Sequence, residues 1–335
     1  MSAAARLLVD ALRAPESVTR LDAGEWTALL AAARAEQLIA SLALRLEDQP
    51  KPSTAAAILA DAVRAAEQGR VQALWEAEMA RRALSPIGIP VILLKGTAFV
   101  AAGLAAGQGR FIGDLDILVP RDSLDAVEAA LLATGWEWVK NDPYDNHYYK
   151  TWMHELPPLI HRDRDRMIDV HHTILPPTAR PKPDAGALIA DSVALPNGLR
   201  VLSAPDVIIH AAAHLFADGD LAGGLRNLWD IDQLIREFEI EPDFWLKLAE
   251  HAKRHDMKKA VSRALRLSSA LYDTPIIQKE ALSLVDQFYH RRLLARDGWG
   301  RITRKLTRLV FYIRSHWIRM PPLLLARHLW AKARR

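Results

Sequence analysis

Two aspartates that stand two positions apart offer the most specific chemistry in this 335-residue sequence. Asp114 and Asp116 lie in the stretch GDLDILVP, where acids alternate with apolar residues. Because alternate residues of a strand face the same side, we expect the two carboxylates to project together. Paired carboxylates suit hard cations such as Mg²⁺, which prefers oxygen ligands and bridges to phosphates. The spacing therefore predicts a magnesium site that handles a phosphorylated substrate.

A third carboxylate follows in the stretch MIDVHH, which contains Asp169. Two Mg²⁺ ions roughly 4 Å apart can clamp the attacking and leaving oxygens of an in-line displacement, and Mn²⁺ could substitute. His171 faces the same side of its strand as Asp169. It could contact a nucleotide, accept a proton near neutral pH, or hold Asp169 in position. The predicted catalytic and metal-binding residues are Asp114, Asp116 and Asp169.

A turn with the sequence Lys95-Gly96-Thr97 precedes this pair of aspartates. Gly96 lets the backbone approach a phosphate closely, and the start of the following helix offers free amide donors. Thr97 can add a hydroxyl contact. Lys95 as a point charge, or Arg110 as a planar fork, could neutralise a triphosphate. The predicted nucleotide-binding residues are Lys95, Gly96, Thr97, Arg110 and His171.

The elements that must position these residues follow from hydrophobic periodicity. Apolar residues at helical spacing predict helices up to about residue 85 and again over 205–272. Strands are expected over 91–94, 115–119, 136–139, 147–154 and 167–172, and helices over 98–106 and 123–134. The run of alternating charges over 161–166 is expected to form a solvated hairpin turn. The pattern predicts an α+β fold with a mixed sheet between N-terminal and C-terminal helical regions.

We expect four regions along the chain. They are an N-terminal helical region (1–85), an α/β core (86–180), a C-terminal helical domain (200–290) and a basic amphipathic tail (291–335).

Composition excludes several classes of protein. Half of the residues are hydrophobic and a quarter are charged, which suits a globular protein with a sizeable core. The chain has no cysteine, so it can form neither a disulfide framework nor a thiolate metal site. A reducing cytoplasm is the expected location.

Charge is distributed unevenly along the chain. Residues 291–335 hold thirteen Lys and Arg and one acid, a local charge of +12, which leaves −8 for residues 1–290. Three interpretations of this tail remain open. It could lie on an anionic membrane surface, bind an acidic protein or nucleic acid, or pack on the body with a solvated basic face. In the first case the protein would be peripheral to the inner face of the membrane.

Two histidines and an arginine-aspartate pair occur in the region of predicted helices after residue 205. His210 and His214 stand one helical turn apart, a spacing that can hold zinc. No acid lies between them, so we expect no zinc there. The favoured interpretation is a structural network of His214, Arg226 and Asp230 that ties the helical domain to the sheet, with His210 beside it.

Together these motifs resemble a known family. The order of an apolar strand, a Gly turn, a helix and Asp-x-Asp is similar to the nucleotidyltransferase superfamily typified by DNA polymerase β. The chain resembles more closely an uncharacterised bacterial nucleotidyltransferase family within it. The matching motifs are Leu94-Lys95-Gly96, Arg110, Asp114-Leu115-Asp116, Asp169-Val170-His171, His210 with His214, and Leu225-Arg226 to Asp230. Thr97 departs from the superfamily's second Gly or Ser.

The resemblance implies a polymerase β-like core and a magnesium-dependent transfer of a nucleoside monophosphate from an NTP, expected to be ATP, with release of pyrophosphate. The acceptor would be a hydroxyl or phosphate of a small molecule, peptide or protein. By analogy Asp114 and Asp116 would hold both metal ions and Asp169 one of them. The alternatives are a non-catalytic nucleotide-binding or partner-binding module with the same fold, and a nucleotidyltransferase that modifies nucleic-acid ends.

Overall fold

The computed structural model describes residues 3–140, 149, 152–217 and 219–319. The helices are α1 (Ala3–Arg13), α2 (Ala23–Ala35), α3 (Ile39–Arg45), α4 (Ser53–Leu84), α5 (Lys95–Ala101), α6 (Leu124–Ala133), α8 (Ala185–Ala190), α9 (Ala204–Ala217), α10 (Gly224–Phe238), α11 (Phe244–Arg254), α12 (Lys258–Tyr272), α13 (Leu284–Leu293) and α14 (Lys305–Arg319). The strands are β1 (Ile92–Leu93), β2 (Leu115–Leu118), β3 (Trp136–Trp138), β4 (Leu159–His161), β5 (Met167–His171), β6 (Val193–Ala194) and β7 (Arg200–Val201).

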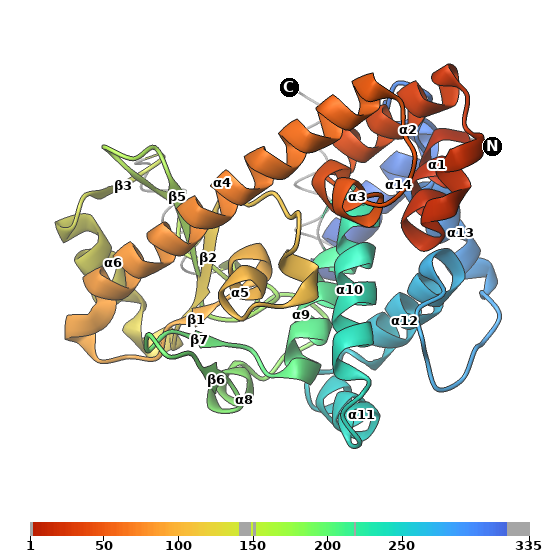
Figure 1. The fold of residues 1–335 in the computed structure, drawn as a ribbon. Coiled ribbons are helices and arrows are strands. Elements are labelled where there is room, and N and C mark those ends of the chain that lie inside the picture. Colours follow the sequence, from red (N-terminus) through yellow and green to blue (C-terminus); the bar gives the residue numbers. More distant parts are fainter. Residues whose placement is uncertain (1–2, 141–148, 150–151, 218, 320–335) are drawn as a thin grey trace.

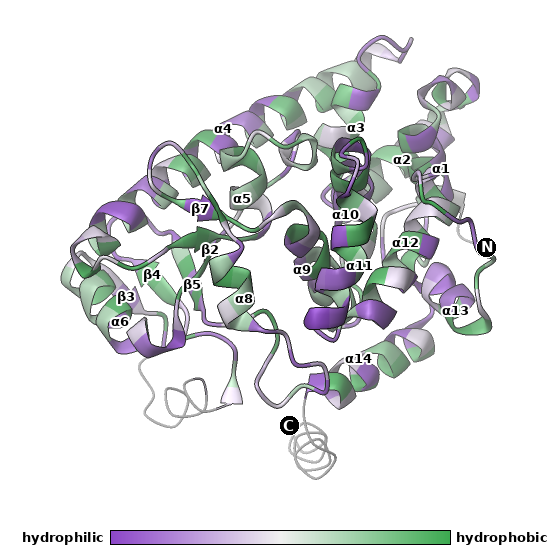
Figure 2. Cartoon of the chain, turned by 90° about the horizontal axis from the view of Figure 1, so that it is seen from below, coloured by the Kyte–Doolittle hydropathy of each residue, from purple (hydrophilic) through white to green (hydrophobic). Residues whose placement is uncertain are grey.

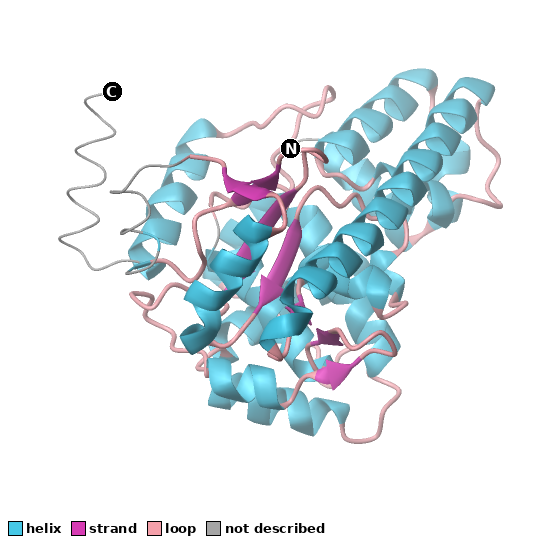
Figure 3. Ribbon diagram, turned by 90° about the vertical axis from the view of Figure 1, so that its left-hand side faces the viewer, coloured by secondary structure: helices cyan, strands magenta, loops and turns pink. Residues whose placement is uncertain are grey.

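The strands form one mixed sheet in the order β3-β4-β5-β2-β1-β7-β6. β2 and β5 run parallel at its centre, and β1 pairs parallel with β7, whereas the remaining pairs are antiparallel. All four residues of β2 are buried, as expected for a strand covered on both faces. The α+β fold with flanking helical regions is therefore confirmed (Figure 3).

The longest helix, α4, links the N-terminal helices to the sheet (Figure 1). Its 32 residues extend about 48 Å at the usual rise per residue. Most of its buried residues are alanines, which let neighbouring elements approach closely, and it packs on α3, α5, α6 and β2. α4 also reaches the hairpin between β4 and β5, where Glu76 binds Arg164 at 2.8 Å and Gln72 binds Arg166. This turn was predicted to be solvated, but two of its arginines are held by α4.

A single hydrophobic cluster runs through the N-terminal helices, the sheet and the C-terminal helices. α9 is its central helix, because it packs on α10, α11, α12 and α14. The tail packs there too, and its backbone joins the core at Arg180, whose N–H donates to Ile318 at 3.0 Å. The division into four regions stays a prediction. Within the described ranges, no helix combines the length and apolarity that a membrane span needs.

Local boundaries differ from the sequence-based expectation near the Lys-Gly-Thr turn. The helix begins at Lys95 and not at residue 98, because Lys95 itself adopts a left-handed φ of 50° and makes the turn. It ends at Ala101 because Gly103 has a φ of 70°, a conformation that stops a helix.

Other strands also differ from the prediction. Half of the predicted strand over 147–154 lies outside the described residues, and residues 149 and 152 within it are helical. The short strands β4, β6 and β7 were not predicted.

Candidate active site

Three carboxylates meet where β2 and β5 lie side by side. The parallel register pairs the Cα of Asp116 with that of Asp169. Asp114 precedes β2 and is exposed, whereas Asp116 is 2% exposed. One carboxylate oxygen from each of the three residues lies within 4.8 Å of the others. The structure therefore brings together the three acids that the sequence singled out, and the donor set consists only of oxygens, as Mg²⁺ prefers.

Asp116 is the most enclosed member of this carboxylate cluster. Its Oδ1 accepts hydrogen bonds from Nζ of Lys95 at 2.6 Å and from Nε2 of His171 at 2.9 Å. Burial alone would raise the pKa of Asp116, but Lys95 and His171 hold that pKa below its usual value. His171 thus contacts Asp116 and not Asp169, the residue it was considered to position. Its Nδ1 lies 3.5 Å from the carboxylate of Glu155.

Asp169 has the opposite electrostatic environment. Burial, and then the negative charges of Asp116 and Glu155, raise the pKa of Asp169 to about 7. A carboxyl group in this position gains a proton unless a cation neutralises the cluster. This mutual repulsion fits a divalent metal ion among the three acids.

Gly96 is required by a close approach of Arg110. A Cβ atom at this position would lie 2.6 Å from Nε of Arg110, so any larger residue would displace the guanidinium. The guanidinium carbon of Arg110 also lies 5.5 Å from the centre of the Phe99 ring. Thr97 is 1% exposed and faces the core, so its side chain is not among those that line a cavity at the site.

Arg110 belongs to a buried ionic network with α10. Its guanidinium binds Asp230, which also accepts a hydrogen bond from Arg226 at 3.3 Å. Arg226 donates to the carbonyl of Gln37 at 2.6 Å and to the hydroxyl of Ser41 at 2.8 Å. Burial lowers the pKa of Arg226 to about 10. The expected link between helical region and core is formed by Arg226, Asp230 and Arg110, and it extends to the N-terminal helices.

The arginine-lined cavity, of about 690 Å³, opens on the Asp114 and Asp116 side of the carboxylates. Four cationic side chains and the two aspartates face it, together with Gly96 and His214. The four cations are Lys95, Arg110, Arg226 and Arg296.

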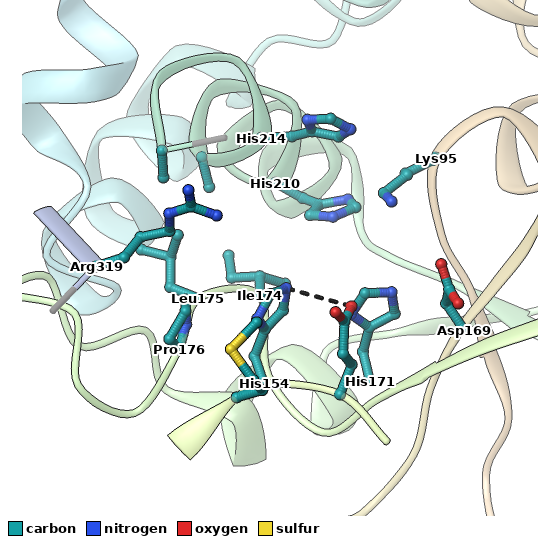
Figure 4. A pocket seen from close by; sticks show the side chains of 14 residues that line it. Lys95, His154, Asp169, His171, Ile174, Leu175, Pro176, His210, His214 and Arg319 are labelled. Atoms are coloured by element: carbon teal, nitrogen blue, oxygen red, sulfur yellow. Dashed lines mark ion pairs between the residues drawn. The ribbon is translucent and has the colours of Figure 1, made fainter. Parts of the chain in front are cut away.

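The histidine-lined cavity, of about 240 Å³, lies on the Asp169 side (Figure 4). Its polar lining comprises Lys95, His154, Glu155, Asp169, His171, His210, His214 and Arg319. Ile174, Leu175 and Pro176 supply an apolar wall. Burial lowers the pKa of His210 well below its usual value, and that of His154 to about 2, so both rings are neutral. Lys95 and His214 line both cavities, and the carboxylates lie between them.

Several cavity residues were missed in the sequence. His154 belongs to no motif singled out in the sequence, yet its side chain is only 19% exposed. Glu155, Arg296 and Arg319 lie outside every recognised motif. For Glu155 the sequence offered one weak signal, an extended stretch before β4. In the structure a β-bridge pairs Glu155 with His171 there. No local pattern marks the two arginines, because their positions depend on how the C-terminal helices pack.

Other clusters of ligand-type side chains occur within the described ranges. His210 and His214 belong to none of the groups that could hold a metal ion there. Asp206, His251 and His255 do form such a group between α9 and α11. Its atoms make hydrogen bonds within the protein: His251 contacts Asp206 at 2.8 Å, and His255 accepts from the backbone of Asp184 at 3.2 Å. The contact between His251 and Asp206 thus holds α11 against α9.

Comparison with known proteins agrees with this geometry. A search among curated proteins found no match. The family model described as "Uncharacterised nucleotidyltransferase" matches residues 22–273, about three quarters of the chain, and this range contains the three carboxylates, the Lys-Gly-Thr turn and the Arg226–Asp230 pair. The chain therefore belongs to this uncharacterised nucleotidyltransferase family.

Proposed function

We propose that this protein transfers a nucleoside monophosphate from an NTP, with ATP as the expected donor, to a hydroxyl or phosphate group of a small molecule, peptide or protein. The observation that carries this proposal is the meeting of Asp114, Asp116 and Asp169 within 4.8 Å, between two cavities of different character. We place the reaction in the cytoplasm, where NTPs are abundant.

Asp114, Asp116 and Asp169 would hold Mg²⁺, and Mn²⁺ could replace it. The fit rests on a pure oxygen donor set and on the burial and the repulsion that together raise the pKa of Asp169 to about 7. Bound ions would supply charge neutralisation at the phosphate oxygens and at the departing pyrophosphate.

The arginine-lined cavity is suited to the triphosphate. Lys95, Arg110, Arg226 and Arg296 would face the phosphates of an NTP, each while it also pairs with a carboxylate of the protein. Gly96 keeps space for Arg110, and Asp230 orients both Arg110 and Arg226. The basic wall would therefore present its guanidinium groups in set directions, which lowers the cost of ordering them when the nucleotide binds.

The histidine-lined cavity is suited to the acceptor. An acceptor oxygen placed there would attack the α-phosphorus, the bond to the β-phosphate would break, and pyrophosphate would leave through the arginine-lined cavity. Asp169 lines the acceptor side and would assist removal of the hydroxyl proton. His171 would hold Asp116 through its 2.9 Å contact and keep the two strands' carboxylates aligned.

The test is transfer of label from α-labelled NTPs. Protein, Mg²⁺ and each NTP are incubated with fractionated cell extract, and labelled products are resolved as small molecules, peptides or proteins. We expect Asp116→Asn to lower transfer by at least about a thousandfold, because it removes one of the carboxylates that would hold Mg²⁺ at the reacting phosphate. Asp163→Asn, an exposed residue of the β4–β5 turn, is the matched control and should transfer normally. Equal activity in the two variants would contradict the assignment, and nucleotide binding without transfer would support the non-catalytic alternative.

A further inference from the structure

α14 has one face that the fold buries and one apolar face that the fold does not use. Phe311, Ser315 and His316 are buried against the body. The ring of Phe311 packs on that of Tyr289 at 4.7 Å between centres, and Arg314 donates to the carbonyl of Phe216 at 2.9 Å. These contacts attach the helix to α13 and α9, so its other face is not needed to hold it in place.

The second face is an apolar stripe exposed to solvent. Its members are exposed by 37 to 81%, and they are Leu306, Leu309, Val310, Ile313 and Trp317. At 3.6 residues per turn, they fall within an arc of about 100° on the side opposite Phe311. α14 lies at the periphery of the molecule, where hydrophobic and hydrophilic residues alternate along it (Figure 2). Among the described residues, none covers the stripe.

The sequence around the stripe is strongly basic. Residues 298–335 contain ten Lys and Arg, no Asp or Glu, and three tryptophans. Arg301, Arg304 and Lys305 are exposed next to the first turn of the stripe. Arg308, although exposed, is paired with Asp220, and Arg314 donates to the carbonyl of Phe216. The outward positive charge is thus concentrated beside exposed apolar side chains.

We propose that the apolar stripe of α14 and its basic neighbours lie on an anionic lipid bilayer, as a surface anchor that does not span it. A bilayer surface supplies both features that the helix presents, an apolar layer for the stripe and anionic headgroups for the arginines. Tryptophan is favoured at that boundary. A second copy that docked through the same helix, or the chain's own residues 320–335, would bring further positive charge to a positive surface. Both are disfavoured as occupants for that reason.

This anchor lies beside the candidate active site. Arg319, the last residue of α14, lines the histidine-lined cavity. A docked helix would therefore hold that cavity close to the headgroup layer.

The test is sedimentation of the full-length protein with vesicles. Vesicles of phosphatidylcholine and phosphatidylglycerol in a three-to-one ratio are compared with phosphatidylcholine alone. We expect binding to the anionic vesicles, weakened by salt, and at least tenfold weaker binding to the neutral ones. The stripe variant replaces Leu306, Val310 and Ile313 with Gln, and should lose at least tenfold in partitioning. The charge variant Arg301→Gln/Lys305→Gln should lose about twentyfold or more, since each basic residue contributes about fivefold.

The matched control carries the same substitutions elsewhere. Val71, Ile240 and Leu246 are exposed by 55 to 78% and lie outside the tail. Their replacement with Gln should leave vesicle binding unchanged. Absence of anionic-vesicle binding would overturn the proposal, as would equal losses in the stripe and control variants. Tight binding to an acidic protein or to nucleic acid that outcompetes vesicles, or a solution dimer that the stripe variant dissociates, would also overturn it.

Discussion

The Nζ atom of Lys95 lies 2.6 Å from Oδ1 of Asp116, at the centre of the carboxylate cluster. Asp116 is buried and Lys95 is about a quarter exposed, so the ammonium group is the main cation that compensates this charge in the metal-free protein. Lys95 also lines the arginine-lined cavity. The same side chain is therefore placed either to neutralise Asp116 or to reach a phosphate.

Replacing Lys95 with Met should make the protein depend on magnesium for stability. Removing one partner of a largely buried ion pair typically costs about 3 to 5 kcal/mol. We expect a lower Tm without metal and a larger rise in Tm on adding Mg²⁺ than in the wild type, measured by thermal unfolding. Lys247→Met, at an exposed position of α11, is the control and should behave as wild type. Identical Mg²⁺-induced shifts in Lys95→Met and wild type would refute this role.

The pKa of Asp169 predicts a pH-dependent effect of Asp169→Asn. Because the fold raises this pKa from its ordinary value near 4 to about 7, the stability it contributes is present below pH 4 and lost as pH rises through 7. In EDTA, Asp169→Asn should match wild type near pH 4 and have a higher Tm above pH 7. Asp163→Asn should show no such trend. A Tm difference that is constant with pH would show that Asp169 is not perturbed.

Gly96→Ala should weaken nucleotide binding. The added Cβ would lie 2.6 Å from Nε of Arg110 and would displace the guanidinium from Asp230 and from the cavity. We expect Kd for an NTP to rise about tenfold or more, as measured by calorimetry. Gly69→Ala, on α4 and away from the cavity, is the matched control, because a Cβ there meets no atom within 4 Å. If both variants bind equally, Arg110 does not contact the nucleotide.

Asp230→Asn should destabilise the protein and weaken nucleotide binding together. It leaves Arg110 and Arg226 without their shared anion, and uncompensated buried charge costs about 3 to 5 kcal/mol. Urea unfolding should report this loss. Asp61→Asn, which disrupts an exposed pair with Arg64 on α4, should change stability little. If the Asp230→Asn variant were as stable as wild type and had an unchanged Kd, the network would contribute neither to stability nor to nucleotide binding.

Local patterns were enough to predict the carboxylates. Asp116 and Asp169 each lie in a short apolar strand, and alternation along a strand decides which side chains share a face. The parallel register of β2 and β5 then makes them neighbours. The Arg226–Asp230 pair was also predictable, since four residues along a helix bring two side chains together.

Long-range packing decided the rest. Arg110 reaches Asp230 across 120 residues of sequence, whereas the prediction linked the pair to His214. Arg296 enters the arginine-lined cavity while it binds Glu36 at 2.7 Å, a contact between opposite ends of the chain. The spacing of residues within one helix or strand cannot predict a contact between such distant parts of the chain. The left-handed Lys95 was missed for a related reason, because a lysine gives no sign of the backbone conformation imposed on it by the site.

The wall of the arginine-lined cavity is assembled from widely separated parts of the chain. Gln37, Arg110, Arg226 and Arg296 all face it, and each comes from a different stretch. A fragment of residues 86–180 would keep every carboxylate but lose two of the four cations. The carboxylate cluster together with its basic wall therefore cannot be cut out or grafted as one continuous segment. A variant that keeps the complete basic wall must therefore keep nearly the whole chain.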